Sequence, residues 1–184
     1  MTLMFAFGVV WAIWVLSWTI TAAACTEMRT TVANRVLLLA GAGLLFGGAI
    51  AWPEAPALWR RDAISIAILS AALLAGFGIG WCARVYLAAL VESDVLRQDD
   101  THVIDTGPCA LVRHPIYIGL IVSTAATAAA SATVLSLSGG ALMIVAIWRQ
   151  AVLQEPYLSE KLGFAYDDYR RHVPLLMPFL PTRR

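Results

Sequence analysis

Residues 107–117 read Gly-Pro-Cys-Ala-Leu-Val-Arg-His-Pro-Ile-Tyr, and a long apolar run continues from Ile116. Pro115 is well suited to open a helix, because its missing N–H would have no intrahelical partner in the first turn. Arg113 and His114 therefore stand at a predicted helix N-terminus, where unpaired N–H groups and the macrodipole already favour an anion. The stretch predicts a site for a small molecule with an anionic group, at the mouth of an apolar helix.

The composition excludes an ordinary soluble domain. The chain has 184 residues, of which 60% are hydrophobic and only 14% are charged, as expected for an integral membrane protein. A net charge of +1 argues against a nucleic-acid partner. Cys25, Cys82 and Cys109 show no CxxC spacing, so neither a disulfide framework nor a metal site is indicated.

We predict an all-α integral membrane protein, one membrane domain over residues 1–184 with about five transmembrane helices. Apolar runs long enough to cross a bilayer can be drawn at 3–24, 36–52 and 63–91, followed by a helical hairpin of 116–134 and 138–153. The hinge of the hairpin is predicted at residues 136–140. If the two arms do not cross, the hairpin is re-entrant and three spans remain.

The positive charges predict the orientation. With five spans, most Lys and Arg residues fall on one side of the membrane, which the positive-inside rule makes the cytoplasmic side. Arg60 and Arg61 lie on the other side and oppose this assignment. The predicted helix mouth at Arg113 and His114 and everything after Gln154 share the cytoplasmic side.

Opposite charges are expected to meet on that side, because Gln154 and Glu155 follow the last span. A carboxylate beside Arg113 and His114 suits a zwitterion, such as the α-amino and α-carboxylate groups of an amino-acid moiety. Tyr117 can present its ring to a flat base or a cation. The alternative is that Arg113, His114 and Glu155 pair only with each other or with lipid headgroups.

Two blocks resemble a known family. Residues 106–119 are similar to the G-P-Y-x-x-V-R-H-P-x-Y-x-G signature of the isoprenylcysteine carboxyl methyltransferases and the related phospholipid methyltransferases. Residues 154–174 are similar to the E-E-x-x-L, F-G-x-x-Y-x-x-Y and V-P pattern of the same family. The blocks occur in the family's order, and the resemblance covers about residues 80–180.

The resemblance implies S-adenosyl-L-methionine as methyl donor, bound between the hairpin and a cytoplasmic tail that covers the pocket. Residues 1–62 would then be two accessory spans, and 63–184 the cofactor-binding core. The methyl acceptor would be a lipophilic small molecule or an isoprenylcysteine-type carboxylate, thiol or amine that arrives from the bilayer. Carried over by position, the cofactor-binding residues are His102, Val103, Ile104, Cys109, Arg113, His114, Pro115, Ile116, Tyr117, Gln154 and Glu155.

The sequence departs from the family pattern at two of these positions. Cys109 stands in place of the usual Tyr, and Gln154 in place of the first Glu of an acidic pair. The match at His102 also needs a gap of one residue. Arg149 resembles an Arg that in the family is proposed to face the methyl acceptor, and Glu155 is a candidate general base; these two are the predicted catalytic residues.

Two other functions remain open. A membrane reductase that uses NADPH would share a hairpin and tail, although the chain is short for one and has no evident basic cluster for a 2′-phosphate. In a non-catalytic membrane scaffold, the tail would be an interfacial amphipathic helix. Binding of the methyl donor distinguishes the three.

Overall fold

The computed structural model describes residues 2–20, 30–52, 54–97 and 103–178, and the prediction for His102 lies outside these residues. All regular secondary structure in the described residues is helical, which confirms the predicted all-α class. The elements in chain order are α1 (Thr2–Ile20), α2 (Val32–Ala42), the π-helix η2 (Gly43–Gly47), α3 (Gly48–Ala51), α4 (Ala63–Arg97), the 3-10 helix η3 (Gly107–Ala110), α5 (Pro115–Ser131) and α6 (Val134–His172).

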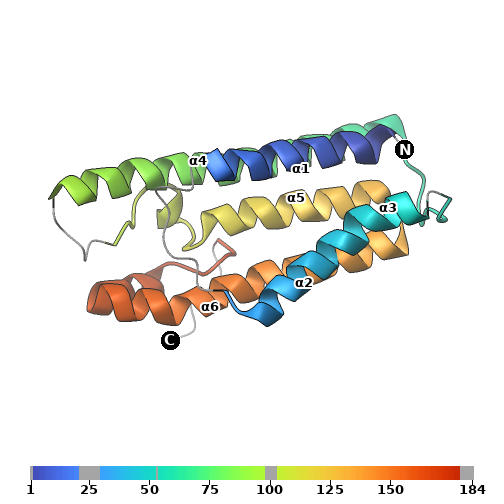
Figure 1. The fold of residues 1–184 in the computed structure, drawn as a ribbon. Helices are drawn as coiled ribbons and strands as arrows, with labels where there is room; N and C mark the ends of the chain where they lie inside the picture. The colour runs from blue at the N-terminus through green and yellow to red at the C-terminus, as the bar shows by residue number, and fades with distance from the viewer. Residues whose placement is uncertain (1, 21–29, 53, 98–102, 179–184) are drawn as a thin grey trace.

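The long helices lie side by side along one axis, with α5 between α4 and α6 (Figure 1). α2, η2 and α3 follow one another without a break, so the described residues form five helical rods. At one end of the bundle α4 ends, α5 begins and α6 finishes. At the other end the loop before α4 meets the turn between α5 and α6, where the Leu58 N–H donates to the Ala132 carbonyl at 2.7 Å.

Small residues let the helices approach closely. A Cβ on Gly119 of α5 would overlap the backbone of α4 at Gly76 and Gly80, so the glycines bring the two backbones into contact. The GxxxG spacing of Gly76 and Gly80 thus serves helix packing. Gly43 and Gly47 have the same spacing, but an added Cβ at either would meet nothing within 4 Å.

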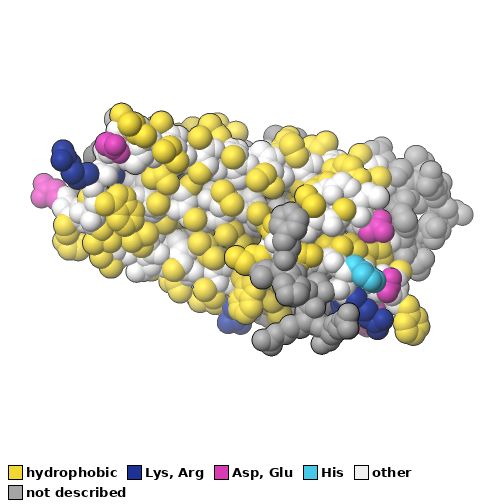
Figure 2. All heavy atoms as spheres, turned by 180° about the vertical axis from the view of Figure 1, so that it is seen from behind, with side chains coloured by type: hydrophobic (Ala, Val, Ile, Leu, Met, Phe, Trp, Pro, Cys, Tyr) yellow, Lys and Arg dark blue, Asp and Glu magenta, His cyan; other side chains and the backbone are white. Residues whose placement is uncertain are grey.

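Two described helices contain an apolar stretch long enough to cross a membrane, α4 within residues 63–90 and α6. Shorter apolar helices cover Leu3–Ser17, Val32–Gly47 and Pro115–Ser131. Hydrophobic side chains cover most of the visible face of the bundle, and charged ones gather mainly toward its ends (Figure 2). Such an apolar exterior suits contact with lipid.

The predicted hairpin hinge at residues 136–140 was wrong. The chain turns at Ala132, which has a left-handed conformation (φ 55°). Thr133 then caps α6, because its Oγ1 accepts a hydrogen bond from the Ser136 N–H at 3.2 Å. Gly139 and Gly140, which suggested a turn, lie inside α6 and pack against neighbouring helices.

Candidate functional site

Three side chains converge on the carboxylate of Glu155 in α6. Arg113 Nη1 donates to Glu155 Oε2. His114 Nε2 lies 2.9 Å from Glu155 Oε1, and the Tyr166 hydroxyl donates to the same oxygen at 2.8 Å. Because an ionised carboxylate only accepts hydrogen bonds, Nε2 of His114 must carry a proton. We call Arg113, His114, Glu155 and Tyr166 the Glu155 cluster.

The Glu155 cluster is largely shielded from solvent, with 16% of the Glu155 side chain exposed. Burial alone would raise the pKa of Glu155, but hydrogen bonds from His114 and Tyr166 and the charge of Arg113 outweigh it. The pKa of Glu155 therefore lies below its ordinary value, and the group is an anion at neutral pH. The pKa of Tyr166 is raised, first by burial and then by the neighbouring carboxylate, so its hydroxyl keeps its proton.

A reversal at Gly163 brings Tyr166 back to Glu155. Eleven residues of straight α-helix would separate the two by roughly 16 Å along the axis. Gly163 instead has φ 60° and ψ −142°, a conformation that L side chains rarely adopt, and the helix turns there. The Ser159 hydroxyl can therefore donate to Asp167 Oδ1 at 2.7 Å across the bend.

The chain that follows α6 lies against the start of α5. The Arg113 N–H donates to the Pro174 carbonyl at 2.9 Å, and the His114 N–H donates to the Leu175 carbonyl at 3.2 Å. In Figure 1 this last described segment, in red, folds back between α6 and the beginning of α5. The tail thus occupies the two backbone N–H groups that directly precede α5.

A short 3-10 turn holds Cys109 beside the cluster. Gly107 has φ 58°, and any Cβ there would collide with the Tyr86 ring. The Cys109 carbonyl accepts a hydrogen bond from the Tyr169 hydroxyl at 2.6 Å. Burial raises the pKa of the Cys109 thiol to about 11, so it is a neutral thiol at neutral pH. Val103 and Ile104 are half-buried in the loop before this turn.

Tyr117 extends the cluster into the bundle. Its ring stacks on His114 with centroids 5.5 Å apart and planes inclined by 21°. Its hydroxyl meets the side-chain amides of Gln150 and Gln154 on α6. Gln150 also accepts a hydrogen bond from Asn34 of α2, so that helix reaches the same interior.

The structure therefore brings most of the predicted site residues to one end of the bundle, with Pro115 and Ile116 supporting the start of α5. Arg149 is exposed on α6, whereas its neighbour Gln150 is buried. Sequence reasoning did not single out Tyr166, Gln150 or Asn34 as site residues. The sequence could have indicated Gln150, because it lies four residues before the predicted site residue Gln154 and therefore on the same helix face.

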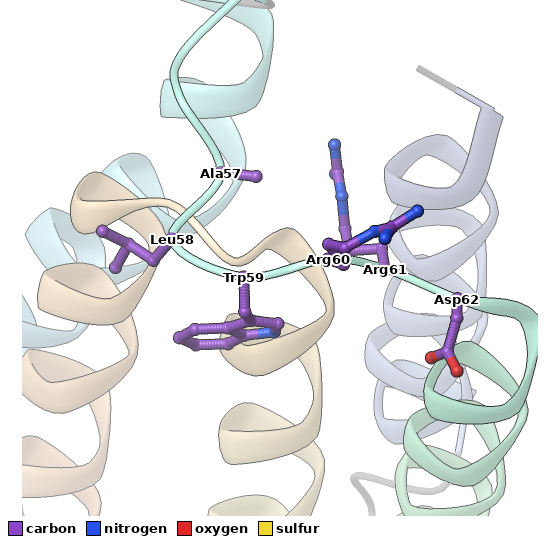
Figure 3. Close-up of a pocket in the computed structure, with 6 residues that line it drawn as sticks. All are labelled: Ala57, Leu58, Trp59, Arg60, Arg61 and Asp62. Atoms are coloured by element: carbon purple, nitrogen blue, oxygen red, sulfur yellow. The ribbon is translucent and has the colours of Figure 1, made fainter.

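One pocket in the described residues lies away from the Glu155 cluster. Figure 3 shows it in the loop before α4, at the opposite end of the bundle from the Glu155 cluster, lined by Ala57, Leu58, Trp59, Arg60, Arg61 and Asp62. Trp59 lies on one side of the loop, and Arg60 and Arg61 extend from the other. The arginines and Asp62 are exposed, so this pocket has none of the shielding of the Glu155 cluster.

Metal ligands are sparse in the described residues. No group of three or more His, Cys, Asp or Glu side chains in the described ranges is placed to hold a metal ion.

The chain is similar in part to two known bacterial proteins, and no family model matches it. Over 76 residues, 40% of the chain, it is 37% identical to methanethiol S-methyltransferase 2 of Bradyrhizobium diazoefficiens, of which this covers 28%. Part of the chain is therefore similar to a methyltransferase. Over 126 residues, 68% of the chain, it is 26% identical to the nickel-cobalt-cadmium resistance protein NccN of Alcaligenes xylosoxydans xylosoxydans, covering 57% of it. The matches thus span about a quarter and somewhat over half of the two relatives.

Proposed function

We propose that this protein is a membrane-embedded methyltransferase of the isoprenylcysteine carboxyl methyltransferase type, which uses S-adenosyl-L-methionine and acts on a lipophilic small molecule or a lipid-linked group. The observation that carries the proposal is the Glu155 cluster, in which a shielded carboxylate lies between an Arg and a His at the start of an apolar helix. The partial similarity to a methanethiol S-methyltransferase supports the same chemistry.

The donor set of the cluster fits an amino-acid moiety. Nε of Arg113 is buried and has no hydrogen-bond partner among the described residues, so a ligand carboxylate would satisfy it. Glu155 and Gln154 supply oxygen acceptors for an ammonium group. The stacked rings of His114 and Tyr117 offer a flat face for a base.

Positioning is what these residues contribute to the reaction. Bound S-adenosyl-L-methionine would supply an activated methyl group, whose transfer by in-line displacement needs no metal and no covalent enzyme intermediate. Arg113, Glu155 and Gln154 would fix the amino-acid end, and Tyr117 would fix the ring end. Proximity and orientation can contribute roughly 7–11 kcal/mol in well-aligned cases. The tail at Pro174 and Leu175 would exclude water from the mouth of α5.

We assign the contacts with the methyl acceptor to Arg149 and Glu155. Arg149 is exposed on α6, where it can meet the polar head of an acceptor that reaches the helix from the bilayer. Glu155 can take a proton from an acceptor that carries one, although its lowered pKa makes it a weak base. A thiolate or carboxylate acceptor needs no base.

The proposed setting is a five-span membrane protein with the Glu155 cluster on the cytoplasmic side. The two long apolar helices and the three shorter ones support this topology. The arginines of the tail, Arg170 and Arg171, lie toward the same end of the bundle as Arg113.

The test is methyl transfer by the purified full chain in detergent. The protein would be incubated with methyl-labelled S-adenosyl-L-methionine and lipophilic thiols, amines and acids, and label in the organic phase would be counted. We expect saturable transfer to at least one class, and none after Glu155→Gln. Binding of NADPH in place of the methyl donor would support the reductase, and binding of neither would support the scaffold.

A further inference from the structure

A row of buried polar side chains connects α2 to the Glu155 cluster. Asn34, in the first turn of α2, is fully buried, and its Nδ2 donates to Gln150 Oε1 at 2.8 Å. The Gln150 side chain is also nearly fully buried, and its amide meets the Tyr117 hydroxyl. Tyr117 in turn stacks on His114 of the cluster. We call Asn34, Gln150 and Tyr117 the amide row.

One atom at the end of the amide row has no partner. Asn34 Oδ1 is buried and accepts no hydrogen bond within the part of the chain that the structure describes. Burying an acceptor in this state costs free energy, so such atoms are rare in proteins unless a ligand or a water serves them. Leu38, one turn further along α2, packs its apolar side chain against the same region of α5 and α6.

The surroundings of the amide row are apolar. Ile147 and Ala151 of α6, which flank Gln150, pack with Tyr117, and Leu38, Leu175 and Leu176 border them. The unpartnered oxygen is therefore the polar end of an otherwise apolar region next to the Glu155 cluster. A group that combines one hydrogen-bond donor with a hydrocarbon chain matches this environment.

From this arrangement we infer that Asn34 determines acceptor specificity: its Oδ1 accepts a hydrogen bond from the N–H or S–H of the methyl acceptor, which is an amine or a thiol and not a carboxylate. The inference rests on the proposed methyltransferase function and deepens it. A carboxylate acceptor offers only lone pairs, which the Asn34 oxygen repels. An amine or a thiol brings the donor that this oxygen lacks. The nitrogen or sulfur would attack the methyl carbon through a lone pair while the bond from that carbon to the donor's sulfonium sulfur breaks, and the methylated product would then release its extra proton to solvent.

The experiment uses the full chain in detergent, labelled S-adenosyl-L-methionine and three probes of equal chain length, 1-butanethiol, butylamine and butyrate. Wild-type protein is compared with Asn34→Leu and Asn34→Asp. Thr124→Val is the matched control, because Thr124 Oγ1 is also buried without a partner in the described residues but belongs to neither the cluster nor the amide row. Affinity for the methyl donor and the thermal midpoint are measured for every variant.

We expect wild-type protein to methylate the thiol or the amine in preference to butyrate. Asn34→Leu should raise KM for that probe about tenfold or more, with donor affinity within about twofold of wild type. Thr124→Val should leave both quantities unchanged. Asn34→Asp keeps an acceptor oxygen of the same size, so its KM should lie closer to wild type than that of Asn34→Leu. The preference should shift toward butylamine, because the new carboxylate binds its ammonium form and can take the proton that must leave before the nitrogen attacks.

Several results would overturn the inference. For Asn34→Leu, these are a KM equal to that of wild type, or a loss of affinity for the methyl donor as large as the rise in KM. For wild-type protein, they are a preference for butyrate, or binding of the methyl donor without methyl transfer to any of the three probes. If Asn34→Leu does not fold, the test rests on Asn34→Asp. A preference between butylamine and 1-butanethiol equal to that of wild type would then contradict a contact between the acceptor and this atom. Failure of wild-type protein to bind the methyl donor is a separate outcome, which removes the proposed function itself.

Discussion

The two ends of the helix bundle carry similar residues in different settings. The Glu155 cluster combines an Arg, a His, a Tyr and a carboxylate. The loop of residues 57–62 at the other end combines a Trp, two Arg and an Asp. Glu155 pairs with residues 11 to 42 positions away, whereas Asp62 accepts from the Ser65 N–H at 3.0 Å, three positions away.

The distance along the chain to these hydrogen-bond partners distinguishes the candidate site at Glu155 from the exposed surface at Asp62. Asp62 caps the start of α4, and hydrogen bonds that its carboxylate accepts from Ser65 lower its pKa. The exposed arginines beside it suit contact with water and lipid headgroups. The Glu155 cluster instead joins α5, α6 and the segment beyond Gly163, so its geometry exists only in the complete fold. We therefore expect substitutions in the cluster to affect ligand binding and those in the loop to leave it intact.

The largest effect is expected from Glu155→Gln. The change removes the anion that Arg113 and His114 share and leaves a shielded cation without a counter-charge, at a cost on the order of 3 kcal/mol in unfolding free energy. Binding of S-adenosyl-L-methionine should be lost. Calorimetric titration and thermal unfolding measure the two effects, and Asp62→Asn is the control that should keep wild-type binding. Equal ligand binding by Glu155→Gln and wild type would contradict the comparison.

A smaller effect is expected from Gly163→Ala, which acts through the reversal that brings Tyr166 to Glu155. At φ 60° and ψ −142° an alanine is strained by about 1–3 kcal/mol, so the bend should weaken and ligand affinity should fall. Gly43→Ala is the matched control, because that glycine has helical φ and open space around an added Cβ. It should be neutral or slightly stabilising. Equal shifts of the thermal midpoint in Gly163→Ala and Gly43→Ala would contradict a role for the bend.

Tyr166→Phe should cost about 1 kcal/mol and change the pH dependence of stability. Because the pKa of Glu155 is lowered by folding, its ionisation stabilises the protein above its unfolded-state pKa, and this stability is lost as the pH falls through the folded-state pKa. Without the Tyr166 hydrogen bond, the folded-state pKa of Glu155 should move up toward its ordinary value. The loss of stability on going from neutral to acidic pH should therefore become smaller. Unfolding midpoints measured from neutral to acidic pH test this, and identical pH profiles for variant and wild type would contradict it.

The smallest effect is expected from the double substitution of Arg60→Ala and Arg61→Ala. Both side chains are exposed and lie at the far end of the bundle from the Glu155 cluster. Affinity for S-adenosyl-L-methionine should stay within about twofold of wild type, because exposed charges at this distance are screened. A large loss of affinity would show that the loop pocket, not the cluster, holds the ligand.

Sequence patterns predicted the helices well where the physical signal was local. The apolar run from residue 63 and Pro115 at the start of α5 gave helix starts that agree with the structure. The meeting of Arg113, His114 and Glu155 was also predicted from their opposite charges. Their pairing with one another is the arrangement that the sequence analysis gave as the alternative to a ligand site.

The remaining features depend on long-range packing that one-dimensional patterns do not contain. Gly139 and Gly140 looked like a hinge, but they are contact points for neighbouring helices, and the turn lies at Ala132 instead. Tyr166 reaches Glu155 only because Gly163 reverses the chain. Asn34 lies just before the predicted span of residues 36–52, in a stretch without a motif, and its place beside Gln150 follows from the packing of α2 on α6.

The central claim, that the Glu155 cluster holds a methyl donor, is tested most directly by thermal unfolding of the detergent-solubilised protein titrated with S-adenosyl-L-methionine. Wild type, Glu155→Gln and the double variant of Arg60 and Arg61 would be compared, with NADPH as the alternative ligand. Ligand that binds the native state raises the midpoint by mass action. We predict a saturable rise for wild type and the double variant and none for Glu155→Gln. A rise with NADPH alone, or a rise in Glu155→Gln equal to that of wild type, would contradict the claim.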